Sequence, residues 1–209
     1  MTPILYLHGF ASGPSSSKAR FFRERLERAG ASVEIPDLAA GDFENLTISG
    51  QLAVMEHAAR GRPMALMGSS MGGYLAALYA ARHPEVTRLV LLAPAFGFAR
   101  RWPARLGQNV ADEWRARGHM DFFHYGENRM RSLSYGLLED ADRYEDFPSF
   151  SQPALIFHGA SDDVVPVQAS EEFAAAHPNA RLEVLQSGHE LLNVLEHMAE
   201  RVLPFLVPR

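Results

Sequence analysis

The chain contains no cysteine among its 209 residues. This absence excludes disulfide bonds, thiolate metal sites and a cysteine nucleophile. Long apolar runs are also missing, since no segment approaches the ~18 apolar residues of a membrane-spanning helix. The first residues have no basic region and only a short apolar run, so a secretory signal peptide is not expected. A cytoplasmic location is therefore the default expectation.

A strong excess of one charge is also missing. The chain has 20 Lys and Arg against 25 Asp and Glu, which gives a net charge of -5, and the signs are mixed along the sequence. Because no basic stripe is present, nucleic acid is not expected as a partner. The apolar fraction of 47% and the charged fraction of 22% are typical of a globular protein. The length suits one domain, or one domain with an insertion.

Short apolar runs alternate with longer amphipathic runs along the chain. The candidate strands are Ile4–His8, Ser32–Pro36, Pro63–Gly68, Arg88–Ala93, Ala154–His158 and Arg181–Gln186. The candidate helices are Ser16–Ala29, Ile48–Arg60, Met71–His83, Val167–Ala176 and Glu190–Phe205. Several strands are almost continuously apolar, as in a parallel sheet that helices cover on both faces. The alternation predicts an α/β fold with right-handed crossovers.

The stretch between Pro94 and Pro153 interrupts this alternation. Its approximately 60 residues contain no strand-like run and are rich in arginine, aromatic and acidic residues. A connection of this length within one domain is usually a functional insertion. We expect a small, partly helical cap over residues 97–150. A loosely ordered surface excursion is the alternative.

The five residues from Gly68 to Gly72 read Gly-Ser-Ser-Met-Gly, which is a G-x-S-x-G pattern. An apolar run precedes the pattern and a helix-like run follows it. A serine on a tight strand-to-helix turn exposes its hydroxyl group at the end of a sheet, and small residues are needed beside it. The pattern therefore makes Ser70 a candidate nucleophile.

A serine nucleophile needs a base and a carboxylate that orients the base. Among the nine histidines, only His189 lies on a loop between the last predicted strand and the final helix. Asp162 and Asp163 follow the preceding strand, and one of them is expected to reach His189. Both loops lie at the carboxyl ends of parallel strands, where ligands bind in open α/β sheets. The other histidines have structural or solvent-exposed interpretations.

The transition state of acyl transfer also requires donors for a developing oxyanion. One N–H group is expected from Met71, which directly follows the nucleophile at the start of a helix. A second N–H group is expected from Phe10, in the loop His8-Gly9-Phe10 after the first strand. The alternative interpretation of His8-Gly9 is a simple strand end followed by a turn.

These motifs together resemble the α/β-hydrolase superfamily over nearly the whole chain. Residues 7–10 (Leu-His-Gly-Phe) are similar to its oxyanion loop, 68–73 (Gly-Ser-Ser-Met-Gly-Gly) to its nucleophile elbow, and 187–189 (Ser-Gly-His) to its histidine loop. Residues 158–166 resemble its acid loop, and this resemblance assigns the acid to Asp162. The first half of the chain is similar to small YqiA-type bacterial esterases. The second half is equally similar to the palmitoyl-protein thioesterase branch of the abhydrolase-domain proteins.

The resemblance implies a trimmed sheet and a particular chemistry. The chain starts on the strand that carries His8, so the resemblance implies six all-parallel strands in the order 2-1-3-4-5-6. It also implies a serine hydrolase that cleaves carboxylic esters of small or medium acyl groups through Ser70, His189 and Asp162. An acyl thioesterase with the same triad is the main alternative. Perhydrolysis, acyl transfer to another acceptor and a non-catalytic ligand-binding protein are further alternatives.

The sequence says less about cofactors, partners and substrate. No metal or organic cofactor is expected, because His119 and His124 lack carboxylate neighbours at ligand spacing. A small-molecule ester or thioester is the expected partner, and the oligomeric state is open. Aromatic residues of the insertion are expected to cover the site or to pack on the sheet (Trp102, Trp114, Phe122, Phe123, Tyr125). The arginines Arg100, Arg101 and Arg105 are interpreted as a solvated basic face rather than as a site for an anionic leaving group.

Overall fold

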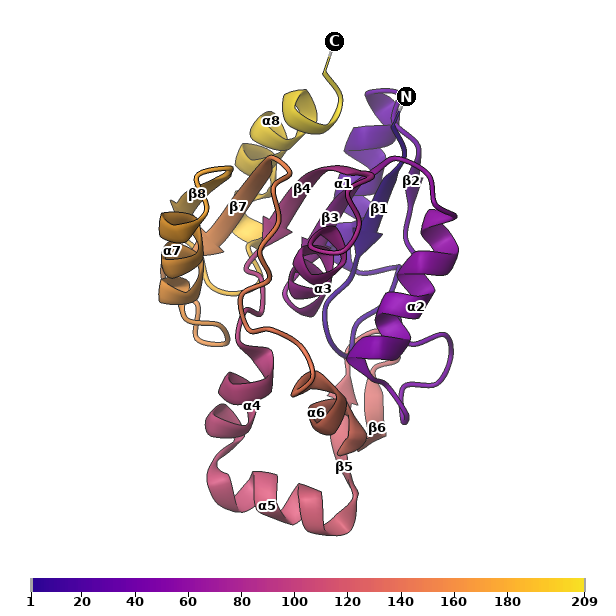
Figure 1. Ribbon diagram of the computed structural model, residues 1–209, viewed down its shortest axis with the longest axis vertical. Coiled ribbons are helices and arrows are strands. Elements are labelled where there is room, and N and C mark those ends of the chain that lie inside the picture. Colours follow the sequence, from indigo (N-terminus) through magenta and orange to yellow (C-terminus); the bar gives the residue numbers. More distant parts are fainter. Residues whose placement is uncertain (1, 209) are drawn as a thin grey trace.

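The computed structural model describes residues 2–208 and is built on a six-stranded sheet (Figure 1). The strands are β1 (Ile4–Leu7), β2 (Val33–Glu34), β3 (Met64–Ser69), β4 (Val86–Leu92), β7 (Ala154–Gly159) and β8 (Ala180–Leu185). They are hydrogen-bonded in the order β2-β1-β3-β4-β7-β8, and every pair is parallel. The α/β fold and the expected order 2-1-3-4-5-6 are therefore confirmed.

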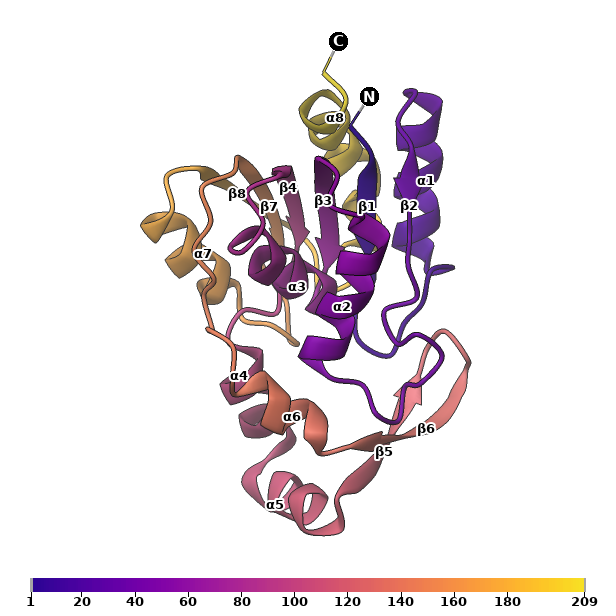
Figure 2. The same ribbon diagram turned by 45° about the vertical axis from the view of Figure 1, so that its right-hand side comes forward.

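Helices cover both faces of the sheet. α2 (Ile48–Ala59), α3 (Met71–Ala80) and α7 (Val167–Ala176) lie on one face. α1 (Ser17–Arg28) and α8 (Leu195–Leu206) lie side by side on the other (Figure 2). Within residues 2–208, no helix has the length and apolar character needed to cross a bilayer.

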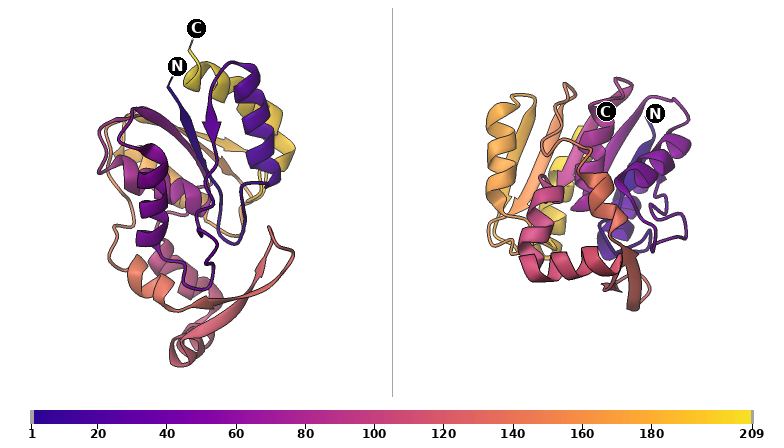
Figure 3. Two further views of the ribbon diagram at one scale, coloured as in Figure 1. Left: turned by 90° about the vertical axis from the view of Figure 1, so that its right-hand side faces the viewer. Right: turned by 60° about the horizontal axis from the view of Figure 1, so that its bottom comes forward.

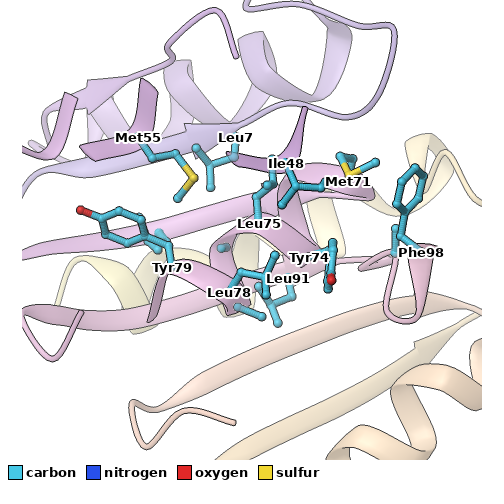
Figure 4. Packing of buried hydrophobic residues seen from close by; sticks show 14 of the residues in the cluster. Leu7, Ile48, Met55, Met71, Tyr74, Leu75, Leu78, Tyr79, Leu91 and Phe98 are labelled. Carbon is cyan, nitrogen blue, oxygen red and sulfur yellow. The ribbon is translucent and has the colours of Figure 1, made fainter. Parts of the chain in front are cut away.

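The alternation of side chains along each strand divides the core into two layers. On β1, Leu5 and Leu7 pack with α2 and α3, whereas Ile4 and Tyr6 pack with α1 and α8. Neighbouring strands repeat this pattern, because successive side chains of a strand point to opposite faces. Figure 4 shows part of the first layer, in which residues of α3 contact residues of β1, β4 and α2. This two-sided burial explains the continuously apolar strands.

Most predicted boundaries lie within two residues of the observed ones, but α3 ends at Ala80 rather than at His83, and the last helix begins later than expected. α8 was expected from Glu190, but a 3₁₀ turn (Leu192–Val194) precedes it and the helix begins at Leu195. Leu191 has a φ of +55°, a left-handed conformation that is incompatible with a continuous right-handed helix. The residues after His189 therefore form a turn before the helix starts.

The insertion between β4 and β7 contains both helices and strands. Its elements are α4 (Phe98–Leu106), α5 (Gln108–Arg117), β5 (His119–His124), β6 (Arg129–Ser134) and α6 (Gly136–Ala141). The antiparallel hairpin of β5 and β6 shows that the expectation of no strand in this stretch was wrong. Along β5, intermediate burial alternates with exposure, and Asn128 adopts a φ of +53° in the connecting turn. One face of the hairpin packs on the protein, as is typical of a half-buried strand.

The inserted elements lie beyond the carboxyl ends of the parallel strands (Figure 1 and the right view of Figure 3). Two hydrogen bonds join them to loops of the main sheet. Tyr125 N–H donates to Ala11 O at 2.7 Å, and Ser134 N–H donates to Glu44 O at 2.8 Å. The insertion is therefore held against the same end of the sheet at which the candidate residues lie.

Candidate active site

Ser70 lies on a sharp turn between β3 and α3. Its backbone has φ +54° and ψ −115°, an unfavourable conformation for a residue with a side chain. Ser70 N–H donates to Leu92 O at 2.8 Å, and Ser70 O accepts from Gly73 N–H and Ala95 N–H, both at 3.0 Å. The neighbouring strand and the helix thus hold the strained turn in place. This geometry is that of a nucleophile elbow.

The glycines at both ends of the motif are required by close backbone contacts. A Cβ atom added to Gly68 would lie 2.2 Å from Gly72 O, and one added to Gly72 would lie 2.1 Å from Leu7 O. Real Cβ atoms do not approach backbone oxygens this closely, and the backbone cannot rotate away as a side chain can. The sequence expectation that larger residues would collide here is therefore confirmed at both positions.

His189 joins Ser70 and Asp162 in one chain of hydrogen bonds. His189 Nδ1 lies 2.7 Å from Asp162 Oδ2, and His189 Nε2 lies 3.1 Å from Ser70 Oγ. Because the carboxylate can only accept, Nδ1 carries a proton, and the neutral ring therefore presents an unprotonated Nε2 to the serine hydroxyl group. The three residues come from loops after β3, β7 and β8, which meet at one edge of the sheet.

The Asp162 side chain is fully buried and richly hydrogen-bonded. Its Oδ1 accepts from Val164 N–H and Val165 N–H, each at 2.8 Å. Burial alone would raise the pKa of Asp162, but hydrogen bonds from His158, His189 and the Val165 N–H group outweigh it and hold this pKa below its ordinary value. The neighbouring Asp163 is exposed and does not cap α7. The structure therefore brings Asp162, and not Asp163, to His189.

His158 is a further site residue to which sequence reasoning gave no role. Its Nε2 lies 3.2 Å from Asp162 Oδ2 and 2.9 Å from Val165 O, and its side chain is fully buried. Since a carbonyl only accepts, Nε2 carries the proton, and Nδ1 is left to accept from Ser170 Oγ at 2.8 Å. The sequence feature that could have indicated this contact is a histidine at the end of an apolar strand, four residues before the aspartate.

The loop after β1 lies against the elbow. Burial lowers the pKa of His8, whose Nδ1 lies 3.0 Å from Gly9 O and whose Nε2 lies 3.2 Å from Leu38 N. The neutral ring therefore donates through Nδ1 and accepts through Nε2, and so fixes the loop. A Cβ atom added to Gly9 would lie 3.5 Å from Ser70 Cβ, which is an ordinary contact. The loop is thus close to Ser70, although a methyl group at Gly9 would fit.

A pocket of about 100 Å³ opens beside Ser70. Its walls come from the loop after β1, the turn at Ser70, the segment after β4, helix α4 and the loop after β7 (Phe10, Ser70, Met71, Ala95, Phe96, Phe98, Arg101, Trp102, Arg105, Val164, Val165, Pro166). The Phe10 and Met71 N–H groups have no hydrogen-bond acceptor within the part of the chain that the structure describes. Both residues line the pocket, and neither N–H group is used in a hydrogen bond within residues 2–208.

The aromatic residues of the insertion divide into two groups. The Trp102 ring packs 4.8 Å from the Phe10 ring, centroid to centroid, and Trp114 is completely buried behind Trp102. By contrast, Phe123 is 41% exposed and Tyr125 is 74% exposed on the hairpin. The expectation of an aromatic cover over the site therefore fits Trp102, whereas the hairpin tip points to solvent.

The three arginines of α4 also have different environments. Arg100 forms an ion pair with Asp146. Arg101 and Arg105 line the pocket instead. The interpretation of these residues as one solvated basic face is therefore incomplete: Arg105 is exposed and Arg101 is half-buried, and both also line the pocket.

Three of the other histidines have packing or hydrogen-bond partners of their own, whereas His57 and His119 are exposed. His83 stacks on Tyr79, with ring centroids 3.7 Å apart, and His177 stacks on Phe173. His124 is buried, and its Nδ1 accepts from Glu127 N–H at 3.1 Å. Within residues 2–208, no group of three or more His, Asp or Glu side chains is arranged to hold a metal ion.

Comparison with known proteins places the chain among hydrolases of this fold. Residues 3–206 match the model of a family described as uncharacterised protein family UPF0227. A 2-hydroxymuconate semialdehyde hydrolase from Pseudomonas putida is 27% identical, over 90% of this chain and 80% of its own.

Solved structures with the same fold include alpha/beta hydrolase domain-containing protein 10 from mouse. It has a TM-score of 0.80 at 20% identity, over 96% of this chain and 87% of its own. Est1E from Butyrivibrio proteoclasticus has a TM-score of 0.78 at 21% identity, over 99% of this chain and 87% of its own. The chain has the α/β-hydrolase fold and belongs to the UPF0227 family.

Proposed function

We propose that this protein is a serine hydrolase that cleaves carboxylic esters of small or medium acyl groups. One observation carries the proposal: the continuous chain from Ser70 Oγ through His189 to Asp162, with distances of 3.1 Å and 2.7 Å. A serine hydroxyl group becomes a useful nucleophile only when a base can take its proton, and here the base is already in contact. The relatedness to hydrolases of several kinds supports the same conclusion.

The reaction proceeds in two halves. Ser70 Oγ attacks the acyl carbonyl carbon while His189 Nε2 takes the hydroxyl proton, and His189 then gives this proton to the departing alcohol. The resulting acyl-enzyme is hydrolysed by a water molecule that His189 activates in the same way. Asp162 keeps the imidazole in the required tautomer and stabilises the imidazolium form, so its low pKa suits this role.

The negative charge that develops on the acyl oxygen is stabilised by backbone donors. Phe10 and Met71 line the same pocket as Ser70, and their N–H groups are the proposed donors. Each such donor contributes about 3 kcal/mol to the stabilisation of an oxyanion. Met71 also begins helix α3, whose N-terminal end favours negative charge. A pocket of about 100 Å³ with largely apolar walls suits a small acyl chain.

Two other substrates deserve comparison in the same assay. An acyl thioester would use the same residues, because only the leaving atom differs. The Pseudomonas putida relative makes 2-hydroxymuconate semialdehyde a second candidate substrate. The assay compares kcat/KM for p-nitrophenyl esters of increasing acyl length, for the matching acyl thioesters and for this semialdehyde. The class of substrate with the highest kcat/KM identifies the protein as an esterase, a thioesterase or a semialdehyde hydrolase.

The decisive experiment is the Ser70→Ala variant. We expect it to lose ester turnover and covalent labelling by a fluorophosphonate probe, because the attacking oxygen is removed. The control is Ser151→Ala, which changes an exposed serine in the segment before β7 and should label and turn over as the wild type does. Unchanged labelling of Ser70→Ala would refute the assignment. Saturable binding of esters without turnover by the wild type would favour a non-catalytic binding protein.

A further inference from the structure

Two arginines give the pocket beside Ser70 a positive charge. Arg101 and Arg105 lie four residues apart on α4, so their side chains lie on the same side of the helix. Both line the pocket, and no aspartate or glutamate is among the lining residues. The other walls are largely apolar. Arg101 is half-buried, and a partly desolvated cation is poorly compensated unless an anion joins it.

Neither guanidinium group has a carboxylate partner. Within residues 2–208, no Asp or Glu oxygen lies within 4.0 Å of Arg101 or Arg105, whereas Arg100 on the same helix is paired with Asp146. The next helix provides another contrast, because Arg117 is paired with Glu113 there. Two like charges one helical turn apart also repel each other. A bound anion would relieve this repulsion and supply the missing partner.

The place of the pocket indicates which part of the substrate carries the anion. Ser70 and both proposed oxyanion donors, Phe10 and Met71, line it, but His189 does not. The leaving group must depart beside His189, because this residue protonates it. The group that fills the pocket is therefore the acyl part, which stays on Ser70 after the first half of the reaction.

We infer that the preferred substrate is an ester whose acyl chain ends in a carboxylate, which Arg101 and Arg105 bind. This inference rests on the proposed function and specifies its substrate class. Guanidinium groups bind carboxylates through paired, charge-assisted hydrogen bonds, which gives selectivity over a neutral chain of equal length. In the reaction, the bond between the acyl carbon and the alcohol oxygen breaks and water supplies the new hydroxyl. The products are a dicarboxylic acid and an alcohol, and the distal carboxylate stays ionised throughout.

The test compares two esters with acyl chains of the same length. The esters are mono-p-nitrophenyl adipate, whose chain ends in a carboxylate, and p-nitrophenyl hexanoate, whose chain is neutral. We expect the wild type to prefer the adipate in kcat/KM by about tenfold or more. A preference of this size is what one charge-assisted hydrogen bond typically contributes. Arg101→Gln and Arg105→Gln should each lower the ratio of the two kcat/KM values, and the double variant should bring it near one. Added salt should lower the wild-type ratio, because Arg105 is exposed.

Arg117→Gln is the matched control, because it removes an arginine of α5 that lies outside the pocket. It should keep the wild-type ratio. A hexanoate ester of 4-hydroxybenzoate places the anion on the leaving group instead, and a preference for this ester over the adipate would overturn the inference. An equal rate on adipate and hexanoate in the wild type would also overturn it. The proposed function would survive equal rates on the two esters, provided that the turnover of the hexanoate still depends on Ser70. Absence of Ser70-dependent turnover of every ester would overturn both.

Discussion

His158 Nε2 lies 3.2 Å from Asp162 Oδ2, the same carboxylate oxygen that accepts the hydrogen bond from His189. The aspartate is therefore held between two histidines, one facing the substrate site and one completely buried. The buried ring is itself fixed by Ser170 and by Val165 O. This arrangement makes the orientation of Asp162 depend on the packing of α7 against the end of β7.

The first prediction concerns His158→Phe. The variant keeps an aromatic ring but removes the N–H group that reaches Asp162 and Val165 O. A buried hydrogen-bonding group left without its partner costs about 1–3 kcal/mol, so we expect lower stability in urea unfolding and a kcat/KM lowered about tenfold or more. His83→Phe is the control, since His83 stacks on Tyr79 away from Asp162. Wild-type kcat/KM in His158→Phe would show that Asp162 is positioned without this contact.

The second prediction concerns the glycines of the elbow. Gly68→Ala and Gly72→Ala would place a methyl group 2.2 Å and 2.1 Å from backbone oxygens. Overpacking against atoms that cannot move aside should lower the free energy of unfolding by about 3 kcal/mol or more. Gly13→Ala is the matched control, because nothing lies within 4 Å of the added Cβ atom. Urea denaturation measures all three variants, and equal stability of the two elbow variants and the control would contradict the prediction.

The third prediction concerns the dependence of stability on pH through Asp162. Burial opposes its ionisation, but its hydrogen bonds hold the folded-state pKa below the ordinary value of 3.8. The folded protein therefore binds fewer protons than the unfolded chain in this range. The resulting stabilisation is fully present above the unfolded-state pKa and is lost as the pH falls from there toward the folded-state pKa.

The comparison of wild type with Asp162→Asn isolates this contribution. We expect the difference in unfolding free energy to be largest near neutral pH and to shrink as the pH falls below 3.8. Urea denaturation at a series of pH values measures it, and other titrating groups cancel in the difference. A difference that stays constant down to about pH 3 would contradict the prediction.

The fourth prediction concerns the size of the acyl pocket. Trp102 lines the pocket and packs on Phe10, so Trp102→Ala should enlarge it. We expect kcat/KM to shift toward longer acyl chains, because each additional buried CH₂ group contributes about 0.8 kcal/mol. Tyr125→Ala, which removes an aromatic ring that is 74% exposed, should keep the wild-type chain-length profile. An unchanged profile in Trp102→Ala would place the acyl chain elsewhere.

Much of the fold and of the candidate site could be predicted from the sequence because local signals carry them. A parallel strand buried on both faces must be apolar throughout, so the six strands of the main sheet are visible in the sequence. The G-x-S-x-G turn tolerates no Cβ atom at Gly68 or Gly72, which ties the motif to one backbone geometry. The chain order of Ser70, Asp162 and His189 follows from the same topology, since each lies after a strand of one parallel sheet.

Tertiary structure alone decided the features that depend on contacts between distant segments. The β5–β6 hairpin mixes polar and apolar residues without a continuous apolar run, and it packs one of its faces on the protein. The contact of His158 with Asp162 and the direction in which α4 turns Arg101 and Arg105 likewise have no local signature. A sequence pattern indicates which face of a helix or strand is apolar. Tertiary packing determines which other residues contact that face and the polar residues beside it. The position of Ser70 on its turn could therefore be predicted from the sequence, but the charge of the pocket beside it could not.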